Sequence, residues 1–276
     1  MINATGNRMT QEIQRQSKLA QRIAVSQTQI SSGKRLSRAS DDPVATSRVA
    51  TLRQAQANDA ARTGNISIGI ALTGQADGIL RSVSDLMARV NELTIAGANS
   101  AMPTADRNVL AAEMTAIADE IDVQSLARSV TGQPLFANGN PQIIRFGADS
   151  AFAPVPSRSA LFETGGMSVA QIVRNAASAV ASGNAAQIGT SITAIAGAVD
   201  HIASASASVG LNAAKLDRLQ DSSALRSIML KEERSMLEDT DLSSAIAELN
   251  AQTLTLEAAQ AAFARINRRS LMDFLN

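Results

Sequence analysis

The chain has 276 residues, with 25 Lys+Arg, 25 Asp+Glu, no Cys, no Trp, no Tyr and 6 Phe. Hydrophobic residues still make up 45% of it, so Ala, Leu, Ile, Val and Met supply nearly all of the apolar surface. The lack of Cys excludes disulfides, thiolate metal sites and Cys nucleophiles, and a single His, His201, removes most His-based chemistry. Many Ala residues and few aromatic ones favour long helices packed along narrow seams.

Positive charge gathers at the start of the chain. Residues 1–40 hold seven basic residues against Glu12 alone, a net charge of +6. Such an arm can bind nucleic acid, an anionic membrane or an acidic protein. It has no aromatic side chain on which a base could stack, so we expect no nucleic-acid partner. It also lacks the apolar core of a secretory signal. Since we find no uncharged apolar stretch of about 18 residues either, we expect no membrane insertion.

Both ends of the chain carry apolar and small residues at alternating intervals of four and three. In the first segment these are Met9, Ile13, Ala20, Ile23 and Ile30, with Gln16 and Gln27 in the same register. In the last segment they are Leu242, Ile246, Leu249, Leu256 and Phe263, with Thr253 and Gln260. This spacing predicts two coiled-coil seams. An isolated helix of this length has little stability in water, so we expect the termini to pair with each other or with copies of themselves.

The region between the arms is also predicted to be helical. Asp42 followed by Pro43 indicates a helix start, with Asp42 as the N-cap. The helical pattern runs to about residue 99, and a second helix follows from about residue 104 to 130. Four glycines at 64, 69, 74 and 78 mark either a break in the first helix or a close approach to a neighbour, and both readings remain open. A last helical region begins at Ser168, which has capping-box spacing to Gln171, and runs towards residue 237 with interruptions near Gly183 and Gly189.

Residues 131–166 differ from the rest of the chain. They hold four of the six Pro and four of the six Phe, together with the turn signals Asn138-Gly139 and Gly165-Gly166. We therefore predict a mostly α fold, an elongated antiparallel helical bundle or coiled coil with a small β-containing or irregular insert. The expected divisions are terminal arms at 1–40 and 241–276, a central bundle at 41–130 and 168–240, and an insert at 131–167.

The sequence offers little that could perform chemistry. Asp200 and His201 are adjacent, and adjacent helical residues point about 100° apart, so Asp200 cannot orient His201 as a catalytic triad requires. We find no phosphate-binding loop, no paired His ligands and no calcium-loop spacing. We therefore expect no enzymatic activity, no catalytic residue, no cofactor and no metal site.

Motifs at both ends resemble those of a known family. Residues 30–36 read ISSGKRL and residues 40–45 read SDDPVA, which resembles the N-terminal signature of the bacterial flagellin family. Near the other end, LEDTDL at 237–242 and SLMDFL at 270–275 are similar to the entry and the end of the family's last helix. Within the family, SDDPVA is more similar to the subunits that join hook to filament than to the filament subunit.

The resemblance implies a structural subunit that is exported unfolded through the flagellum and whose termini become ordered on assembly. It places the arms in an inner layer, the central bundle in the next layer and the insert outside. The implied partners are other copies of the chain, hook-associated protein 1, flagellin, the flagellar export apparatus and an export chaperone. The implied location is extracellular, in the flagellum, after export by the flagellar type III system without a cleaved signal peptide. The assembly contacts are expected at the ten apolar seam residues named above and at Leu271 and Phe274.

Three other readings remain. The chain could be a short filament flagellin, or, in a different class, a secreted module whose insert binds a surface ligand such as a polysaccharide. The family resemblance also matches Arg89, Leu93 and Glu113 to middle-layer positions that contact the animal innate immune receptor for flagellin, so these residues are candidate receptor contacts.

Overall fold

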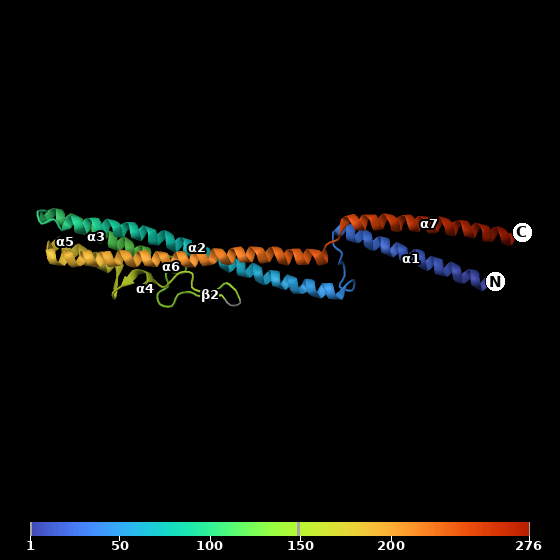
Figure 1. Ribbon diagram of the computed structural model, residues 1–276, viewed down its shortest axis with the longest axis horizontal. Helices are drawn as coiled ribbons and strands as arrows, with labels where there is room; N and C mark the ends of the chain where they lie inside the picture. Colours follow the sequence, from blue (N-terminus) through green and yellow to red (C-terminus); the bar gives the residue numbers. More distant parts are fainter. Residues whose placement is uncertain (1, 148–149, 276) are drawn as a thin grey trace. The chain divides into compact units, whose positions relative to one another are not determined.

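The computed structural model describes the backbone of residues 2–147 and 150–275, and the side chains of residues 9–147 and 150–265. Within this range the chain is mostly helical, which confirms the predicted fold class (Figure 1). The elements are α1 (Ile2–Ser32), α2 (Pro43–Gly97), α3 (Thr104–Ser125), β1 (Ile144–Arg145), β2 (Ala151–Phe152), α4 (Arg158–Phe162), β3 (Glu163–Thr164), β4 (Met167–Ser168), α5 (Val169–Ser182), α6 (Ala185–Glu238) and α7 (Leu242–Leu275).

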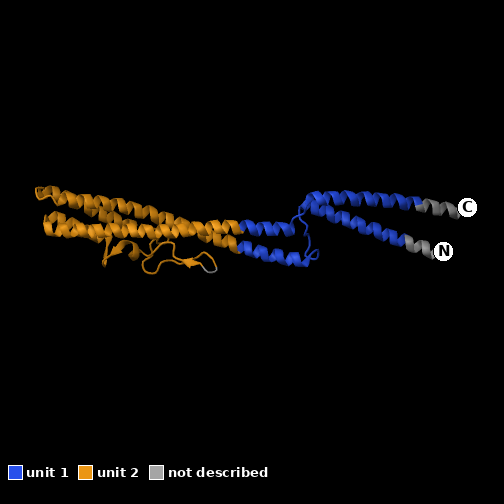
Figure 2. Ribbon diagram, viewed as in Figure 1, with its two compact units in different colours: residues 1–57, 227–276 blue, residues 58–226 orange. Residues whose placement is uncertain are grey.

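The chain divides into two compact units (Figure 2). Unit 1 comprises residues 1–57 and 227–276, and unit 2 comprises residues 58–226. Unit 1 therefore contains α1, α7 and the adjoining ends of α2 and α6. Unit 2 contains the remainder of those two long helices, α3, α5 and the insert.

The predicted helix starts are confirmed. Helix α2 begins at Pro43, and the Asp42 carboxylate accepts the N–H three residues along at 2.9 Å. Helix α5 follows Ser168, whose hydroxyl accepts the N–H of Gln171 at 3.1 Å. It ends before Gly183, where φ is +67°, a left-handed conformation that glycine adopts without steric cost. The interruption expected near Gly183 is therefore present.

Two helix boundaries differ from expectation. Helix α3 ends at Ser125, before the expected residue 130. Helix α6 continues through Gly189 without a break. For the four central glycines of α2, which left two readings open, the structure shows an unbroken helix, and at Gly69 it shows a close approach: a Cβ there would lie 2.9 Å from Leu216 Cδ2 and 3.0 Å from Phe146 Cε1. Gly69 thus permits a close approach of helix and insert.

The core of unit 2 lies between α2, α3, α5 and α6. Most of its buried side chains are unbranched or branched apolar chains without rings, among them Leu80, Met87, Met114 and Ile195. The insert contributes Phe162, whose ring meets that of Phe136 edge to face at 4.9 Å. The sparse aromatic residues are thus concentrated where the insert joins the helices.

The insert contains two small antiparallel hairpins, β1 with β2 and β3 with β4, as its composition predicted. Gly165 and Gly166, with φ of +57° and +80°, form the two-residue turn between β3 and β4. Phe146 packs between Ile66 and Leu216. The ring of Phe152 lies 4.7 Å from that of Phe146. All these contacts fasten the insert to the side of the helices.

Helix α6 is long and apolar enough, by length and composition, to span a membrane, with an 18-residue stretch of mean hydropathy 1.2. Core helices of soluble bundles meet the same criterion. The apolar residues Ile188, Ile195 and Ile202 of this helix lie in the core of unit 2. The expectation that the chain does not insert into membranes stays a prediction.

Candidate assembly site

The two terminal helices pair with each other. Helices α1 and α7 run antiparallel and in contact, and together they are called the terminal hairpin (Figure 1). This is the first of the two arrangements that the seam spacing predicted. Helix α1 ends before Gly33, where φ is +67°, and α7 begins after Asp241, whose carboxylate accepts the N–H groups of Ser243 and Ser244 at 3.0 and 3.3 Å.

The contact between these helices, called the seam, is marked by the less exposed side chains at heptad spacing. On α1 they are Glu12, Gln16, Leu19, Ile23, Ser26 and Ile30, and on α7 they are Ala245, Leu249, Gln252, Leu256, Ala259 and Phe263. Five of the expected apolar residues therefore lie in the seam. The alternate positions are shifted by one residue, so that Glu12, Leu19 and Ser26 take the places expected for Ile13, Ala20 and Gln27.

The displaced residues form a second surface, called the apolar flank. It consists of Met9, Ile13 and Ala20 on α1 and Leu242 and Ile246 on α7, all exposed, with Ile13 at 53% and Ile246 at 47%. At about 100° per residue, Ile13, Ala20 and Ile246 lie about 80° from the seam in the same rotational sense, whereas Met9 and Leu242 lie one heptad before the seam residues Gln16 and Leu249. In an antiparallel pair, equal rotations bring both sets to the same side. These exposed apolar residues therefore lie on one side of the terminal hairpin, Met9 and Ile13 towards its tip and Leu242 and Ile246 at its base.

The opposite face of the hairpin is polar. It contains a groove of about 530 Å³ lined by Lys18, Arg22, Val25, Glu248 and Gln252, among others. The seam itself also contains two buried polar atoms, Nε2 of Gln16 and Oε1 of Gln252. Neither has a hydrogen-bond partner among the described residues. Such atoms weaken helix pairing. The hairpin is therefore two-faced and held together weakly.

The linkers that leave the hairpin are joined by backbone hydrogen bonds. The N–H of Arg35 donates to the carbonyl of Glu238 at 2.7 Å, and the N–H of Thr240 donates to the carbonyl of Gly33 at 2.9 Å. The Arg35 guanidinium also donates to the carbonyl of Leu237 at 2.9 Å. Residues about 200 positions apart in the chain are thereby held together where α1 ends and α7 begins.

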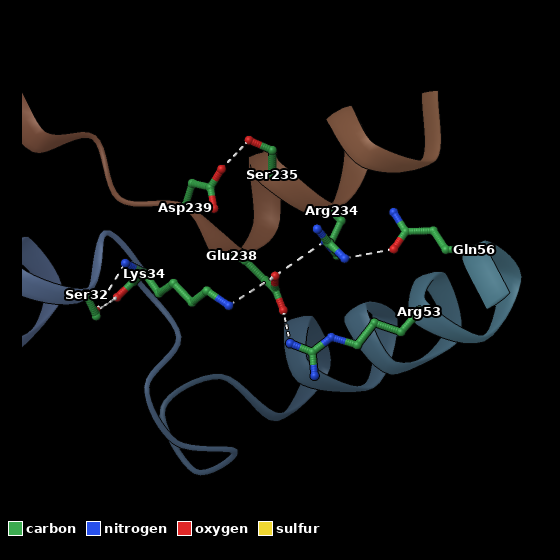
Figure 3. A network of polar contacts seen from close by, with 8 residues as sticks. All are labelled: Ser32, Lys34, Arg53, Gln56, Arg234, Ser235, Glu238 and Asp239. Atoms are coloured by element: carbon green, nitrogen blue, oxygen red, sulfur yellow. Dashed lines mark hydrogen bonds and ion pairs between the residues drawn. The ribbon is translucent and has the colours of Figure 1, made fainter. Parts of the chain in front are cut away.

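A group of charged side chains lies beside these linkers, called the clasp and consisting of Lys34, Arg53, Arg234 and Glu238 (Figure 3). The Glu238 side chain is only 7% exposed. Its carboxylate pairs with Lys34 Nζ at 3.9 Å, with Arg234 Nε at 3.5 Å, and with the Arg53 guanidinium. Arg234 also donates to Gln56 Oε1 at 2.8 Å. One buried carboxylate therefore connects the first linker, α2 and α6.

Two aspartates organise the linkers further. The Asp41 carboxylate accepts hydrogen bonds from the N–H of Arg38 and from the hydroxyl and N–H of Ser37, and these bonds lower the pKa of Asp41. The Ser244 hydroxyl donates to Asp241 at 2.7 Å and, with the N–H of the same residue, lowers the pKa of Asp241. Both aspartates thus favour the charged form in the folded chain.

The clasp was missed by reasoning from the sequence. Glu238 lies inside the LEDTDL motif, but no local pattern distinguishes it from Glu232 or Glu233 on the same helix. Its partner Arg53 is 185 positions away. The nearest signal in the sequence was the pair of family motifs, ISSGKRL and LEDTDL, that contain its members Lys34 and Glu238.

The candidate receptor contacts are only partly accessible. Arg89 on α2 donates to Glu113 on α3 at 2.9 Å, and this bond, with a weaker one to Glu92, raises the pKa of Arg89. Leu93 is 3% exposed and belongs to the core of unit 2. Only Arg89 and Glu113 thus present side chains to a partner in the folded chain, and receptor contact stays a prediction.

The other expected site residues fall outside these surfaces. The backbone of Leu271 and Phe274 lies in α7, but their side chains lie outside the described residues. His201 has a buried Nε2 with no hydrogen-bond partner in the described part of the chain, and Asp200 is exposed. Among the described residues there is also no group of three or more His, Cys, Asp or Glu side chains placed to hold a metal ion.

Most of the chain matches two regions of one known protein family. Residues 3–140 match the bacterial flagellin N-terminal helical region, and residues 192–275 match the bacterial flagellin C-terminal helical region. The chain belongs to the bacterial flagellin family. The terminal hairpin and the clasp both lie inside the regions that the family shares.

Proteins of similar sequence include a flagellar hook-associated protein and a flagellin. Flagellar hook-associated protein 3 of Salmonella typhimurium is 29% identical over 165 residues, which are 60% of this chain and 49% of that protein. Flagellin of Listeria innocua is 23% identical over 256 residues, which are 89% of this chain and 88% of that protein. The chain thus matches about half the length of the first relative and most of the second.

Solved structures of the family share the fold. A Vibrio parahaemolyticus protein described as a flagellar hook-associated protein superposes with a TM-score of 0.66 at 18% identity, covering 72% of this chain and 99% of that chain. FlgL of Xanthomonas campestris superposes with a TM-score of 0.58 at 16% identity, covering 67% and 99%. At these identities the likeness concerns the fold.

Proposed function

We propose that this chain is the hook-filament junction subunit of a bacterial flagellum, a structural protein without enzymatic activity. The observation that carries the proposal is its similarity to the Salmonella hook-associated protein 3. The SDDPVA motif at residues 40–45 supports the same assignment. In this role the chain would contact hook-associated protein 1 on one side and flagellin on the other.

The apolar flank is the surface through which copies of the chain would contact one another. Its large side chains are exposed in the single chain and gathered on one face, and burying such a face is favourable in proportion to the apolar area removed from water. Closed or helical assemblies repeat one contact many times. The seam residues would then hold the hairpin, and the flank would hold the assembly.

The weak seam suits a subunit that is exported unfolded. A hairpin with buried, unpaired Gln16 and Gln252 atoms opens more readily than one with an apolar seam. The lack of Cys means that no disulfide blocks passage of the extended chain. We therefore assign the protein to the outside of the cell, reached through the flagellar type III system with the help of an export chaperone and without a cleaved signal peptide.

Deletion of the gene tests the junction role. The expected phenotype is loss of motility with soluble flagellin shed into the medium, because filament subunits then have no base on which to polymerise. Quantitative mass spectrometry of purified flagella should find few copies per flagellum. Thousands of copies per flagellum would contradict the junction role.

The alternative role is that of a short filament flagellin, and one observation favours it. The Listeria flagellin matches along most of both chains, whereas hook-associated protein 3 extends well beyond the match. The same copy-number measurement separates the two roles, because a filament subunit would be present in thousands of copies.

A polysaccharide-binding role gains no support from the insert. Three of its four Phe rings are buried, and the fourth, Phe152, packs at a tilt against Phe146 and lies under Lys215 Nζ at 3.9 Å. The rings that could have formed a ligand platform are used to fasten the insert to the helices.

Substitutions on two faces of α7 test the role of the apolar flank. Ile246→Glu, present as the only copy of the chain, should stop assembly of the chain into flagella while leaving the helical content of the single chain unchanged, because the residue is already exposed. Leu254→Glu is the matched control, since Leu254 is also exposed and apolar but points away from both seam and flank. Equal loss of incorporation in both variants would contradict a face-specific contact.

A further inference from the structure

The clasp lies beside the backbone hydrogen bonds that join the linker after α1 to the segment before α7. Lys34 follows α1 by two residues, and Glu238 is the last residue of α6, just before the linker to α7. The clasp therefore flanks both arms, although its members are far apart in the chain. It contains no residue of the seam or of the apolar flank.

We infer that Glu238 is a positioning residue for assembly, which holds the two linkers together so that α1 and α7 leave the rest of unit 1 side by side. This inference rests on the proposed function, in which the arms assemble with other copies. The weak seam does not align the arms well by itself. The ion pair between Glu238 and Lys34 aligns the arms by holding the end of α6, next to the start of α7, close to the end of α1.

The first argument is the asymmetry of the clasp. Three cations surround a single carboxylate, and the carboxylate is buried whereas Lys34, Arg53 and Arg234 are partly exposed. Loss of one cation leaves Glu238 with two partners. Loss of the Glu238 charge leaves Lys34, Arg53 and Arg234 close together without their shared counterion, so that the three cations repel one another. Glu238 is therefore the one member of the clasp with which each of the other three forms an ion pair.

The second argument is the effect of a tether on pairing. Two segments joined at a short distance from their bases meet at a high effective concentration, and this concentration falls as the connecting chain grows longer and looser. With the clasp formed, the path from α1 to α7 crosses only a few linker residues. Without it, the side-chain link between Lys34 and the end of α6 is lost, and the bases of the two arms are held together by fewer contacts.

The third argument is that the clasp is separate from the core. The buried residues of unit 2 are held by aliphatic packing and share no side chain with the clasp. A change at Glu238 should thus alter the arms and spare unit 2. This separation distinguishes a positioning role from a general contribution to stability.

The experiment measures the distance between the two arm bases in the full chain. Because the protein has no Cys, Ser31→Cys with Ser243→Cys gives two unique attachment points for nitroxide labels, and both serines are exposed. Double electron-electron resonance then reports the distribution of distances between the labels. It does so whether or not the arms are fully helical.

The labelled double-cysteine chain without any change at Glu238 should give one narrow distribution of distances between the labels. Glu238→Gln should broaden it at least about twofold, while the thermal midpoint of unit 2 stays unchanged. Glu238→Asp, which keeps the charge, should restore a narrow distribution. The matched control is Glu233→Gln, on the same helix, where the side chain is 42% exposed and pairs with Arg48.

A broad distribution in the background chain, or a narrow one in Glu238→Gln, would overturn the inference. Equal broadening in Glu233→Gln would also overturn it, because any lost ion pair would then have the same effect. The measurement uses the single chain in solution. Failure of the junction role in the deletion strain would therefore leave its outcome unaffected, and the two results are distinguishable.

Discussion

Replacing Gly74 by Ala should stabilise unit 2, whereas the same replacement at Gly69 should not. Both residues lie inside α2, where a glycine costs about 1 kcal/mol relative to alanine. Around Gly74, no atom outside the adjacent backbone of α2 and the two chain neighbours lies within 4 Å of the position that a Cβ would take. The full gain of about 1 kcal/mol is therefore expected there.

At Gly69 the same gain is opposed by overpacking. The new Cβ would approach Leu216 Cδ2 to 2.9 Å and Phe146 Cε1 to 3.0 Å, and both side chains are fully buried. Inserting a methyl group into a packed core costs about 1–3 kcal/mol. Gly69→Ala should thus range from neutral to destabilising by about 2 kcal/mol. The difference between the two variants isolates the packing cost, because the helix propensity term is shared.

Urea unfolding followed by far-UV circular dichroism measures both free energies of unfolding. A difference of 1 kcal/mol corresponds to about 2–4 °C in the thermal midpoint of a domain of 150–250 residues. In a double-mutant cycle, Gly69→Ala with Leu216→Ala should cost less than the sum of the two single changes, because the truncated side chain makes room. If Gly69→Ala stabilises the protein as much as Gly74→Ala, the close packing of insert and helix is refuted.

Three further changes test other parts of the structure. Asp59 is 5% exposed, and among the described residues its carboxylate accepts only the hydroxyl of Ser223, at 3.5 Å from each oxygen, so Asp59→Leu should raise the free energy of unfolding by about 1–2 kcal/mol in urea titrations. Ser168→Ala should lower the free energy of unfolding by about 1 kcal/mol, because the capping bond to Gln171 is lost. Hydrogen exchange of the backbone amides of α5 should then be faster. The folded-state pKa of Asp241 is lowered, so its capping contribution is complete above the ordinary value of 3.8 and disappears as the pH falls through the lower folded value. The backbone amide shifts at the start of α7 should therefore titrate with a midpoint below 3.8, and a midpoint at or above it would contradict the capping geometry.

Local signals in the sequence predicted local structure well. The N-caps at Asp42 and Ser168, the left-handed Gly183 and the turn at Gly165-Gly166 all occur where short patterns indicated. Each depends on the chemistry of a few neighbouring residues. The same holds for the insert, whose Pro and Phe content separated it from the helices.

The seam and the clasp needed information from distant parts of the chain. A heptad that contains Ile23 and Ile30 can be completed by residues on either side, so the pattern alone could not choose between Ile13 and Glu12 as the neighbouring contact. The choice depends on which face of α7 is available. Glu238 and Arg53, 185 positions apart, carry no local pattern that pairs them. The role of Gly69 likewise became clear only with Phe146 placed beside it.

The division of the terminal hairpin into seam and apolar flank has a consequence for genetics. A subunit altered in the seam, for instance at Leu249, should still be exported but lose its paired arms, so that it cannot dock on the growing structure and behaves as a recessive allele. A subunit altered only in the flank, at Ile13 or Ile246, should still fold and be delivered. It would then occupy a place among normal copies and stop further addition. Flank alleles should therefore be dominant over the normal gene, so inheritance in a strain that carries both copies can report which face a residue belongs to.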